Sequence, residues 1–421
     1  MTTRIFRLTA LSAKYLENLP AGEGLVIVKP ERKLEQELEG ALHKVWDTRA
    51  DVTAVFQGVI SYFSTLTADP ACLELVDREV NAIAHYVSEG IVYRPSFDTI
   101  RDYVMARCAR LCATLVHARI GGTFIDGTDL MVCSEGHGGL YVNWEESMVR
   151  VKARLSAPGL YVLSCGYGRT PAGYCMSLGR KGEDLMAMSV ASALSADKVE
   201  VYVTDDDILF IPAVSYEEAA VFCGKEEGAV APAALLPVMK AGIPVIVKDI
   251  RDLSRFCRIS SDKPSTDKII TGFLVEDDLS LLNLRGTSLV GKVGISSAIF
   301  GALARGGVNI RLISQPSSEF CISIAVEHED LPAALEALKT LYSGGQVGME
   351  ESLDVEEYIS ILSVCGNRMK NVPGTSGKVF SALGEAGVNI VSAAQGGDEL
   401  SISIVIRTAD KARALSALEK L

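Results

Sequence analysis

The 421-residue sequence lacks the features that would place it in a membrane or on nucleic acid. No apolar run approaches membrane-spanning length, and the N-terminus lacks the charged-then-apolar pattern of a signal peptide. The formal net charge is −12, whereas contacts with nucleic acid phosphates need a basic face. We therefore expect a cytoplasmic protein that has no membrane and no nucleic acid among its partners.

The sequence also lacks a recognisable metal motif. Its ten cysteines include no C-x-x-C pair and show no regular spacing. Cys108 and Cys112 lie one helical turn apart without a nearby histidine, and His117 and His137 have no partner at a useful spacing. We expect buried, reduced thiols and no resident metal ion.

An internal repeat is the most informative feature that is present. Residues 294–326 match residues 374–406 at a constant offset of roughly 80 residues, with about 14 of 33 aligned positions identical. Each copy predicts an amphipathic helix, a glycine turn, a strand, a polar turn and an alternating strand. With the strand before and the helix after each copy, the order is the β-α-β-β-α-β pattern of a ferredoxin-like unit, present twice.

Upstream of the repeat, short apolar runs alternate with helical periodicity. This alternation predicts a mainly parallel sheet covered by helices. The polar stretch at residues 260–268 is the natural linker to the repeat. Buried-type strands are expected at residues 25–29, 123–126, 160–165, 199–207 and 243–250, with helices notably at residues 101–118 and 184–194.

The stretch LGRKGED, residues 178–184, precedes a run of small residues. It is typical of a tight turn that opens a helix, where backbone N–H groups can bind an anionic substrate. By contrast RIFRLTALS, residues 4–12, reads as a strand and turn with no glycine. A protein that handles phosphates should need a permissive loop there too.

Several segments of the sequence resemble one known protein family. GVNIRLISQPSSEFCISI and GVNIVSAAQGGDELSISI are similar to the paired ACT domains at the C-terminus of aspartokinases. GYGRTPAGYCMSLGRKGED and VEVYVTDDD resemble that family's Gly-rich strand, its G-R-x-G-S-D motif and its nucleotide-binding strand. The resemblance implies an α/β fold in which an amino-acid-kinase-like domain at residues 1–262 precedes ACT domains at 270–348 and 355–421. It also implies a homodimer formed through the ACT domains.

Aspartokinases transfer the γ-phosphoryl group of ATP to the β-carboxylate of aspartate, which requires particular donors in particular places. By resemblance, Arg180 clamps the substrate carboxylate and Asp184 organises the reacting phosphates. Arg7 stands where the family's lysine reaches those phosphates. If the chain is active, ATP and Mg²⁺ are its cofactors, and the other nucleotide-site residues are Gly179, Gly182, Thr204 and Asp205.

The first loop departs from the family pattern. The family's K-F-G-G-T-S run is Arg7 to Ser12 here, and Thr9 and Ala10 add Cβ atoms where the backbone must approach phosphate closely. In the family, the next segment contains a turn of small hydroxyl residues. The aligned run in this chain, VIVKPERKLEQE, has no such turn. The family's nucleotide loop after the T-D-x-D strand is replaced by ILFIPAVSYEE.

Substrate contacts depart from the pattern as well. The G-E pair that helps to hold aspartate's amino group is Ala106-Arg107, which puts a cation where an anion is needed. The serine of G-S-D is Glu183. The segment with the family's phosphate lysine reads GAVAPAA, which has no lysine, and Lys225 or Lys240 is a candidate substitute.

The ACT repeats imply a site for an amino-acid effector, where a helix N-terminus faces the turn after the second strand. Many lysine-sensing relatives have aspartate where this chain has Arg311, so we expect lysine to bind poorly and the effector to be neutral or acidic. The alternative is that the repeats only mediate dimerisation through edge strands. The effector residues implied are Ser296, Asn309, Ile310, Arg311, Gln315, Ser317, Ser318 and Glu319.

Two functions therefore stay open. The first is a catalytically weakened or inactive aspartokinase homologue that senses an amino acid and acts as a regulatory protein, with an active paralogue as a possible partner. The second is a functional aspartate kinase that uses substitute phosphate-binding residues. We favour the first because several donors that the reaction needs are replaced.

Overall fold

The computed structural model divides the chain into two units, Met1–Pro264 and Ser265–Leu421, which are described separately. The residues that it describes are 2–8, 14–18, 22–30, 32–48, 52–93, 96–136, 139–179, 182–204, 211–223, 229–261, 270–286, 290–291, 293–317, 320–343, 352–366, 369, 372–397 and 399–421.

The first unit is built on an eight-stranded sheet in the order β10-β12-β11-β9-β1-β2-β6-β3. All neighbouring pairs are parallel except β11–β12. Strand β2 is buried along its whole length, as expected for a parallel strand that is covered on both faces. The strands are β1 (Thr2–Leu8), β2 (Gly24–Pro30), β3 (Thr123–Ile125), β6 (Leu160–Ser164), β9 (Lys198–Val203), β10 (Ala213–Ser215), β11 (Val245–Asp249) and β12 (Phe256–Ser260).

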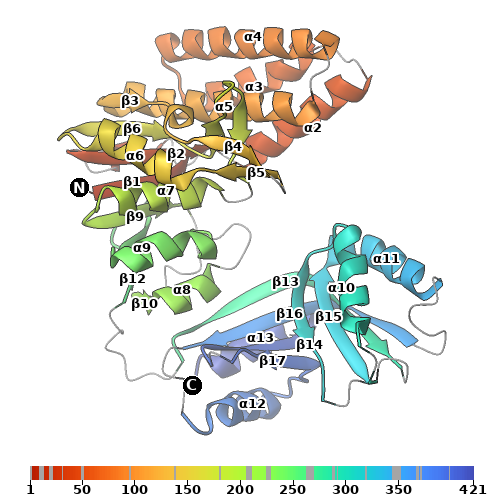
Figure 1. Ribbon diagram of the computed structural model, residues 1–421. Coiled ribbons are helices and arrows are strands. Elements are labelled where there is room, and N and C mark those ends of the chain that lie inside the picture. The colour runs from red at the N-terminus through yellow and green to blue at the C-terminus, as the bar shows by residue number, and fades with distance from the viewer. Residues whose placement is uncertain are drawn as a thin grey trace. The chain divides into compact units, whose positions relative to one another are not determined.

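Helices cover this sheet, and two small hairpins flank it. Figure 1 shows α2, α3 and α5 stacked beside the sheet with α4 outermost. A core cluster of buried residues joins these helices to β2 and β6. The helices are α2 (Arg32–Thr48), α3 (Val52–Leu66), α4 (Pro70–Tyr93), α5 (Phe97–Ile120), α6 (Trp144–Leu155), α7 (Gly182–Ala193), α8 (Tyr216–Phe222) and α9 (Leu235–Ala241), and the hairpins are β4 (Cys133–Gly136) with β5 (Gly139–Val142) and β7 (Tyr167–Arg169) with β8 (Cys175–Ser177).

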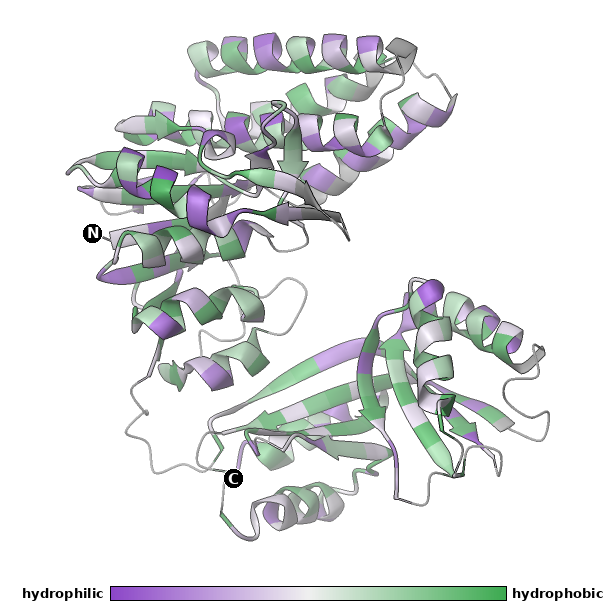
Figure 2. Cartoon of the chain, viewed as in Figure 1, coloured by the Kyte–Doolittle hydropathy of each residue, from purple (hydrophilic) through white to green (hydrophobic). Residues whose placement is uncertain are grey.

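The second unit is one antiparallel sheet of six strands in the order β14-β15-β13-β16-β18-β17. Figure 2 shows its strands mostly green, consistent with a sheet that is packed by apolar side chains. Its strands are β13 (Gly272–Arg285), β14 (Ile310–Ser314), β15 (Cys321–Glu327), β16 (Ser352–Cys365), β17 (Ser392–Gln395) and β18 (Ser401–Arg407), and its helices are α10 (Ile295–Arg305), α11 (Leu331–Ser343), α12 (Thr375–Glu385) and α13 (Lys411–Leu418).

Two long strands, β13 and β16, are shared between the copies of the repeat. They pair antiparallel along their length, with register shifts where Asp278 and Tyr358 adopt positive φ. Beyond the shift, Leu282 packs with α10 and α11, whereas Phe273 at the other end packs with α12 and α13. Each β-α-β-β-α unit therefore uses half of each long strand, and β16 is both the last strand of the first unit and the first strand of the second.

The sheet of the second unit curves until its two edge strands meet. The Ser314 hydroxyl on β14 donates a 3.1 Å hydrogen bond to the Ala393 carbonyl on β17. A third apolar cluster, which includes Leu281 of β13 and Ile361 of β16, lies between these edges. The helices pack on the opposite side of the strands from this cluster, because alternate residues of a strand face opposite sides.

The sequence-based fold is confirmed: a mainly parallel α/β domain precedes a tandem ferredoxin-like region. Each expected strand and each named helix is present, with ends that differ by a few residues. The strand β3 was expected to be buried but is exposed or half-buried, because it is the edge strand of the sheet, and residues 205–207 of the expected strand 199–207 lie outside the described residues. Eight of the ten cysteines are buried. Within the described residues, none of the helices combines the length and apolar character needed to cross a membrane.

Candidate functional site

The candidate site lies where β1, β2 and β9 end and α7 begins. In open α/β sheets this edge is the usual place for a ligand, because loops and helix N-termini converge there. The turn before α7 requires its glycines. Gly179 has φ +84°, and a Cβ atom on Gly182 would lie 2.6 Å from the Cβ of Leu178.

Asp184 in the first turn of α7 is buried, and both of its carboxylate oxygens have partners. The Lys29 ammonium group at the end of β2 contacts Oδ1, and the backbone N–H of Ala231 donates to Oδ2 over 2.8 Å. Lys29 and Asp184 are 5% and 6% exposed, so water does not reach this pair freely. The predicted partner Arg180 lies outside the described residues.

Lys29 is a functional candidate that the sequence reasoning missed. Its backbone pairs in parallel register with that of Arg7, the position aligned with the family's phosphate lysine. Lys29 thus lies on the neighbouring strand beside the Arg7 position, and its side chain contacts Asp184. The sequence signal that could have identified Lys29 is a single charged residue at the end of the apolar run VIVK. The side chain of Arg7 is not among those described.

Carboxylates gather around Tyr167 on β7, beside this turn. The Tyr167 hydroxyl donates to Glu35 of α2 over 3.5 Å. Burial, and then the negative charges of Glu35, Glu183 and Asp102, raise the pKa of Tyr167 well above its usual value. This corner is therefore acidic, although Arg101 of α5 lies 3.1 Å from Oδ1 of Asp102 and offsets part of its charge.

Asp102 is a second residue that the sequence reasoning missed. It is 7% exposed on α5 and accepts a 2.8 Å hydrogen bond from the backbone N–H of Ser177, at the start of the glycine turn. It lies one helical turn before Ala106 and thus on the same face of α5. Arg107, in contrast, contacts Glu79 of α4. The Arg107 side chain is thus paired with α4, and the buried carboxylate on the Ala106 face of α5 belongs to Asp102.

The other nucleotide-site candidates are less well connected. Thr204 directly follows β9 and is partly buried. Lys240, proposed as a substitute phosphate lysine, is exposed on α9. Asp205 and Lys225 lie outside the described residues, so no phosphate-binding loop after β9 can be built from the described part of the chain.

In the second unit, the predicted effector residues divide between two ends of β14. Ser296 at the start of α10 lies at the same end of the sheet as Gln315 and Ser317, because α10 begins after β13 and β13 runs parallel to β14. Asn309 lies at the opposite end, roughly 15 Å away along the strand. Ser318 and Glu319 are outside the described residues.

Arg311 is surrounded by carboxylates. Its guanidinium group contacts Glu276 of β13, and its Nε atom lies 3.5 Å from Oε1 of Glu327 on β15. Burial raises the pKa of Glu327 more than the Arg311 charge lowers it. The positive charge that was expected to repel a cationic effector is thus offset locally.

Comparison with known proteins agrees with this architecture. The model of the amino acid kinase family matches residues 48–249, and the ACT domain model matches residues 282–342 and 362–421. E. coli aspartokinase III, solved in complex with lysine and aspartate, has a similar fold with a TM-score of 0.78 at 17% identity, covering 100% of this chain and 99% of that one.

Relatives found by sequence are also aspartokinases. The bifunctional aspartokinase/homoserine dehydrogenase 2 of Arabidopsis thaliana chloroplasts is 31% identical over 280 residues, which is 62% of this chain and 31% of that protein. The aspartokinase of Geobacillus stearothermophilus is 28% identical over 288 residues, 65% of this chain and 67% of that protein. The chain thus spans about a third of the length of the first relative.

Proposed function

The chain belongs to the aspartokinase family, and on this premise we propose that it is a catalytically weakened or inactive member that acts as an amino-acid-sensing regulatory protein. The family reaction, ATP-dependent phosphorylation of the β-carboxylate of L-aspartate, belongs to aspartate-derived amino-acid biosynthesis. The proposed role is regulation in that pathway rather than turnover.

The observation that carries the proposal is the buried contact of Lys29 with Asp184. In the family the aspartate organises the reacting phosphates, which requires its oxygens to be available. Here one oxygen faces Lys29 and the other accepts from Ala231. If a triphosphate bound Lys29, the buried carboxylate of Asp184 would lose its counter-ion, which is strongly unfavourable.

The acidic corner around Tyr167 supports the same conclusion. Glu35, Glu183 and Asp102 lie close enough to raise the pKa of this phenol. Phosphoryl transfer needs positive charge that neutralises the oxygens of the transferring group. Clustered carboxylates instead disfavour a polyanion and suit an ammonium or guanidinium group.

A functional aspartate kinase with ATP and Mg²⁺ is the second candidate, and one observation favours it. Lys29 pairs in register with Arg7, so a lysine of the neighbouring strand could take the place of the family's phosphate lysine. In that case the contact with Asp184 would be the resting arrangement of a working site, and the phosphates would displace Asp184 from Lys29.

An assay of ADP release or hydroxamate formation with aspartate and ATP–Mg²⁺ distinguishes the two candidates. The full-length chain is compared with Asp184→Ala, Lys29→Met and the matched control Lys240→Met, which changes an exposed lysine of α9. We expect the same baseline rate in all four proteins. Turnover that disappears in Asp184→Ala and Lys29→Met but persists in Lys240→Met would establish the kinase instead.

The ACT region supplies the sensing part of the proposal, with an amino-acid effector and a homodimer through these domains. The ends of α10 and β14 that hold Ser296 and Gln315 offer backbone groups to a carboxylate. We propose a neutral or acidic effector, with a penalty against lysine that Glu276 makes smaller than a bare Arg311 would impose. Calorimetry with lysine and threonine, repeated on Arg311→Asp, tests this. Tight lysine binding that the substitution leaves unchanged would contradict it.

A further inference from the structure

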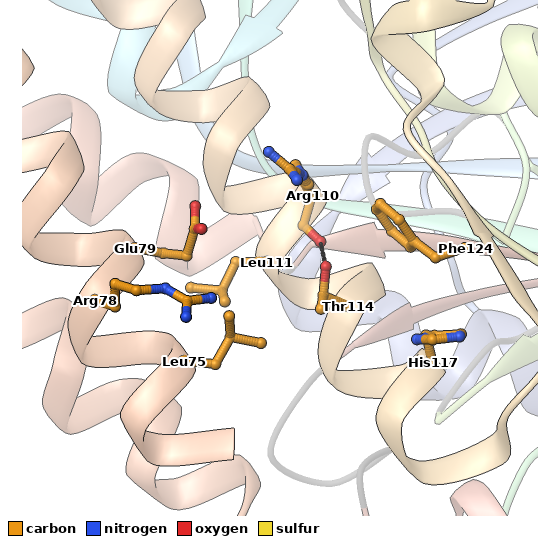
Figure 3. Close-up of a pocket in the computed structure, with 8 residues that line it drawn as sticks. All are labelled: Leu75, Arg78, Glu79, Arg110, Leu111, Thr114, His117 and Phe124. Carbon is orange, nitrogen blue, oxygen red and sulfur yellow. Dashed lines mark hydrogen bonds between the residues drawn. The ribbon is translucent and has the colours of Figure 1, made fainter. Parts of the chain in front are cut away.

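A pocket of about 310 Å³ lies between α4 and α5 in the first unit. Figure 3 shows Leu75 and Arg78 of α4 on one side, with Thr114 and His117 of α5 and Phe124 of β3 on the other. This volume is at the lower end of the roughly 300–1,000 Å³ that is typical of ligand pockets. It therefore suits a compact molecule.

The pocket exists because α4 and α5 are held together nearer to their connection. The rings of Tyr86 and Tyr103 stack with centroids 3.8 Å apart. Farther from the connection between the helices, Arg107 of α5 contacts Glu79 of α4. These contacts tie the antiparallel helices at the connected end. Beyond the Arg107 contact, side chains no longer fill the space between the helices, and the pocket begins there.

Its floor is apolar. Leu111 of α5 is 2% exposed, and Leu75 and Phe124 complete an aliphatic and aromatic surface. Such a surface favours a hydrocarbon or ring, since each buried CH₂ group contributes about 0.8 kcal/mol.

Its polar groups carry mainly positive charge. Glu79, the acidic residue of the lining, already contacts Arg107. Arg110 lies near Asp126, with Nε and Oδ2 3.5 Å apart, and its side chain stays 40% exposed. Arg78 makes no ion pair with any residue that the structure describes. A guanidinium fork at the mouth of an apolar pocket matches a carboxylate.

We propose that this pocket binds a small carboxylic acid with an aromatic or branched apolar body. The apolar part lies against Leu111 and Phe124, and the carboxylate faces Arg78 and Arg110. The site is separate from both the Lys29–Asp184 pair and the ACT region, so the kinase-like domain has a ligand site of its own. Binding there would stabilise the contact of α4 with α5.

Titration of the full-length chain with 3-phenylpropionate, followed by ligand-detected NMR or calorimetry, tests the proposal. We expect saturable binding with a Kd on the order of 1 mM, as for a ligand of this size. 3-Phenylpropionamide, the uncharged isostere, should bind at least tenfold more weakly. Arg78→Ala should weaken binding of the acid about tenfold, because one charge-assisted contact is lost.

Two further variants make the test specific. Arg119→Ala removes an exposed arginine of the same helix α5 that does not line the pocket, and it should leave binding unchanged. Leu75→Trp fills the space and should abolish binding while the far-UV circular dichroism spectrum is kept. The proposal is overturned by no saturable binding up to 20-fold above the expected Kd, by equal binding of acid and amide, or by binding that Arg78→Ala and Leu75→Trp leave intact.

Discussion

The contact between Lys29 and Asp184 allows the sharpest prediction about stability. Asp184→Asn removes the negative charge and leaves Lys29 buried at 5% exposure without a counter-ion. Loss of one partner of a buried ion pair costs about 3–5 kcal/mol. Domains are stable by roughly 5–15 kcal/mol, so the first unit should lose a large share of its stability.

The double variant Lys29→Met/Asp184→Leu should recover part of that loss, because two apolar side chains of similar volume replace both charges, while the buried N–H of Ala231 loses its acceptor. The matched control is Arg150→Met, which breaks the Arg150–Glu146 pair of α6, whose side chains are 47% and 48% exposed. Pairs of this kind contribute about 0–1 kcal/mol, so the control should change little.

Urea unfolding followed by tryptophan fluorescence measures these effects in the correct unit. Both tryptophans, Trp46 and Trp144, belong to the first unit. If Asp184→Asn is neutral or stabilising, the reasoning is refuted. That result would indicate a residue kept for catalysis at the expense of stability, as active-site residues often are.

Three other predictions concern the turn before α7, the Glu200 carboxylate and the oligomeric state of the second unit. Gly182→Ala should destabilise the start of α7 by about 1–3 kcal/mol, because the new Cβ atom would overlap Leu178 at 2.6 Å. Gly58→Ala, in open space on α3, should cause no such loss, and the urea midpoints of the two variants test this. Burial raises the pKa of Glu200, but hydrogen bonds from Lys198, Lys248 and Tyr202 outweigh it and bring this pKa to about 2. The stability from Glu200 is then present above about pH 4.5 and lost as the pH falls toward 2, so Glu200→Gln should flatten the acid side of a stability–pH curve, and an unchanged slope would contradict this. A homodimer through the second unit should appear in sedimentation velocity of the isolated residues 265–421, and a monomer at all concentrations would contradict it.

The sequence predicted the elements of the fold because they depend on local patterns. Apolar runs such as residues 25–29 are long enough to read as buried strands, and the repeat revealed two similar units. The sharing of β13 and β16 was not predictable, since it depends on register shifts near Asp278 and on pairing between distant strands.

The site was predicted only in part, for a related reason. Gly179 and Gly182 could be located from a motif, because a tight turn constrains consecutive residues. The contact of Lys29 with Asp184 joins residues 155 positions apart, and the contact of Asp102 with Ser177 joins residues 75 apart. No local pattern encodes such contacts, so a lysine and an aspartate that the sequence left unlinked meet only in the folded chain.

Equilibrium binding of ATP–Mg²⁺ to the full-length chain tests the central claim most directly, because it does not depend on finding the correct acceptor. If the Lys29–Asp184 pair closes the phosphate site, calorimetry should give no saturable heat at millimolar nucleotide, for the natural chain and for Lys29→Met alike. Saturable binding by the natural chain that Lys29→Met abolishes would contradict the account.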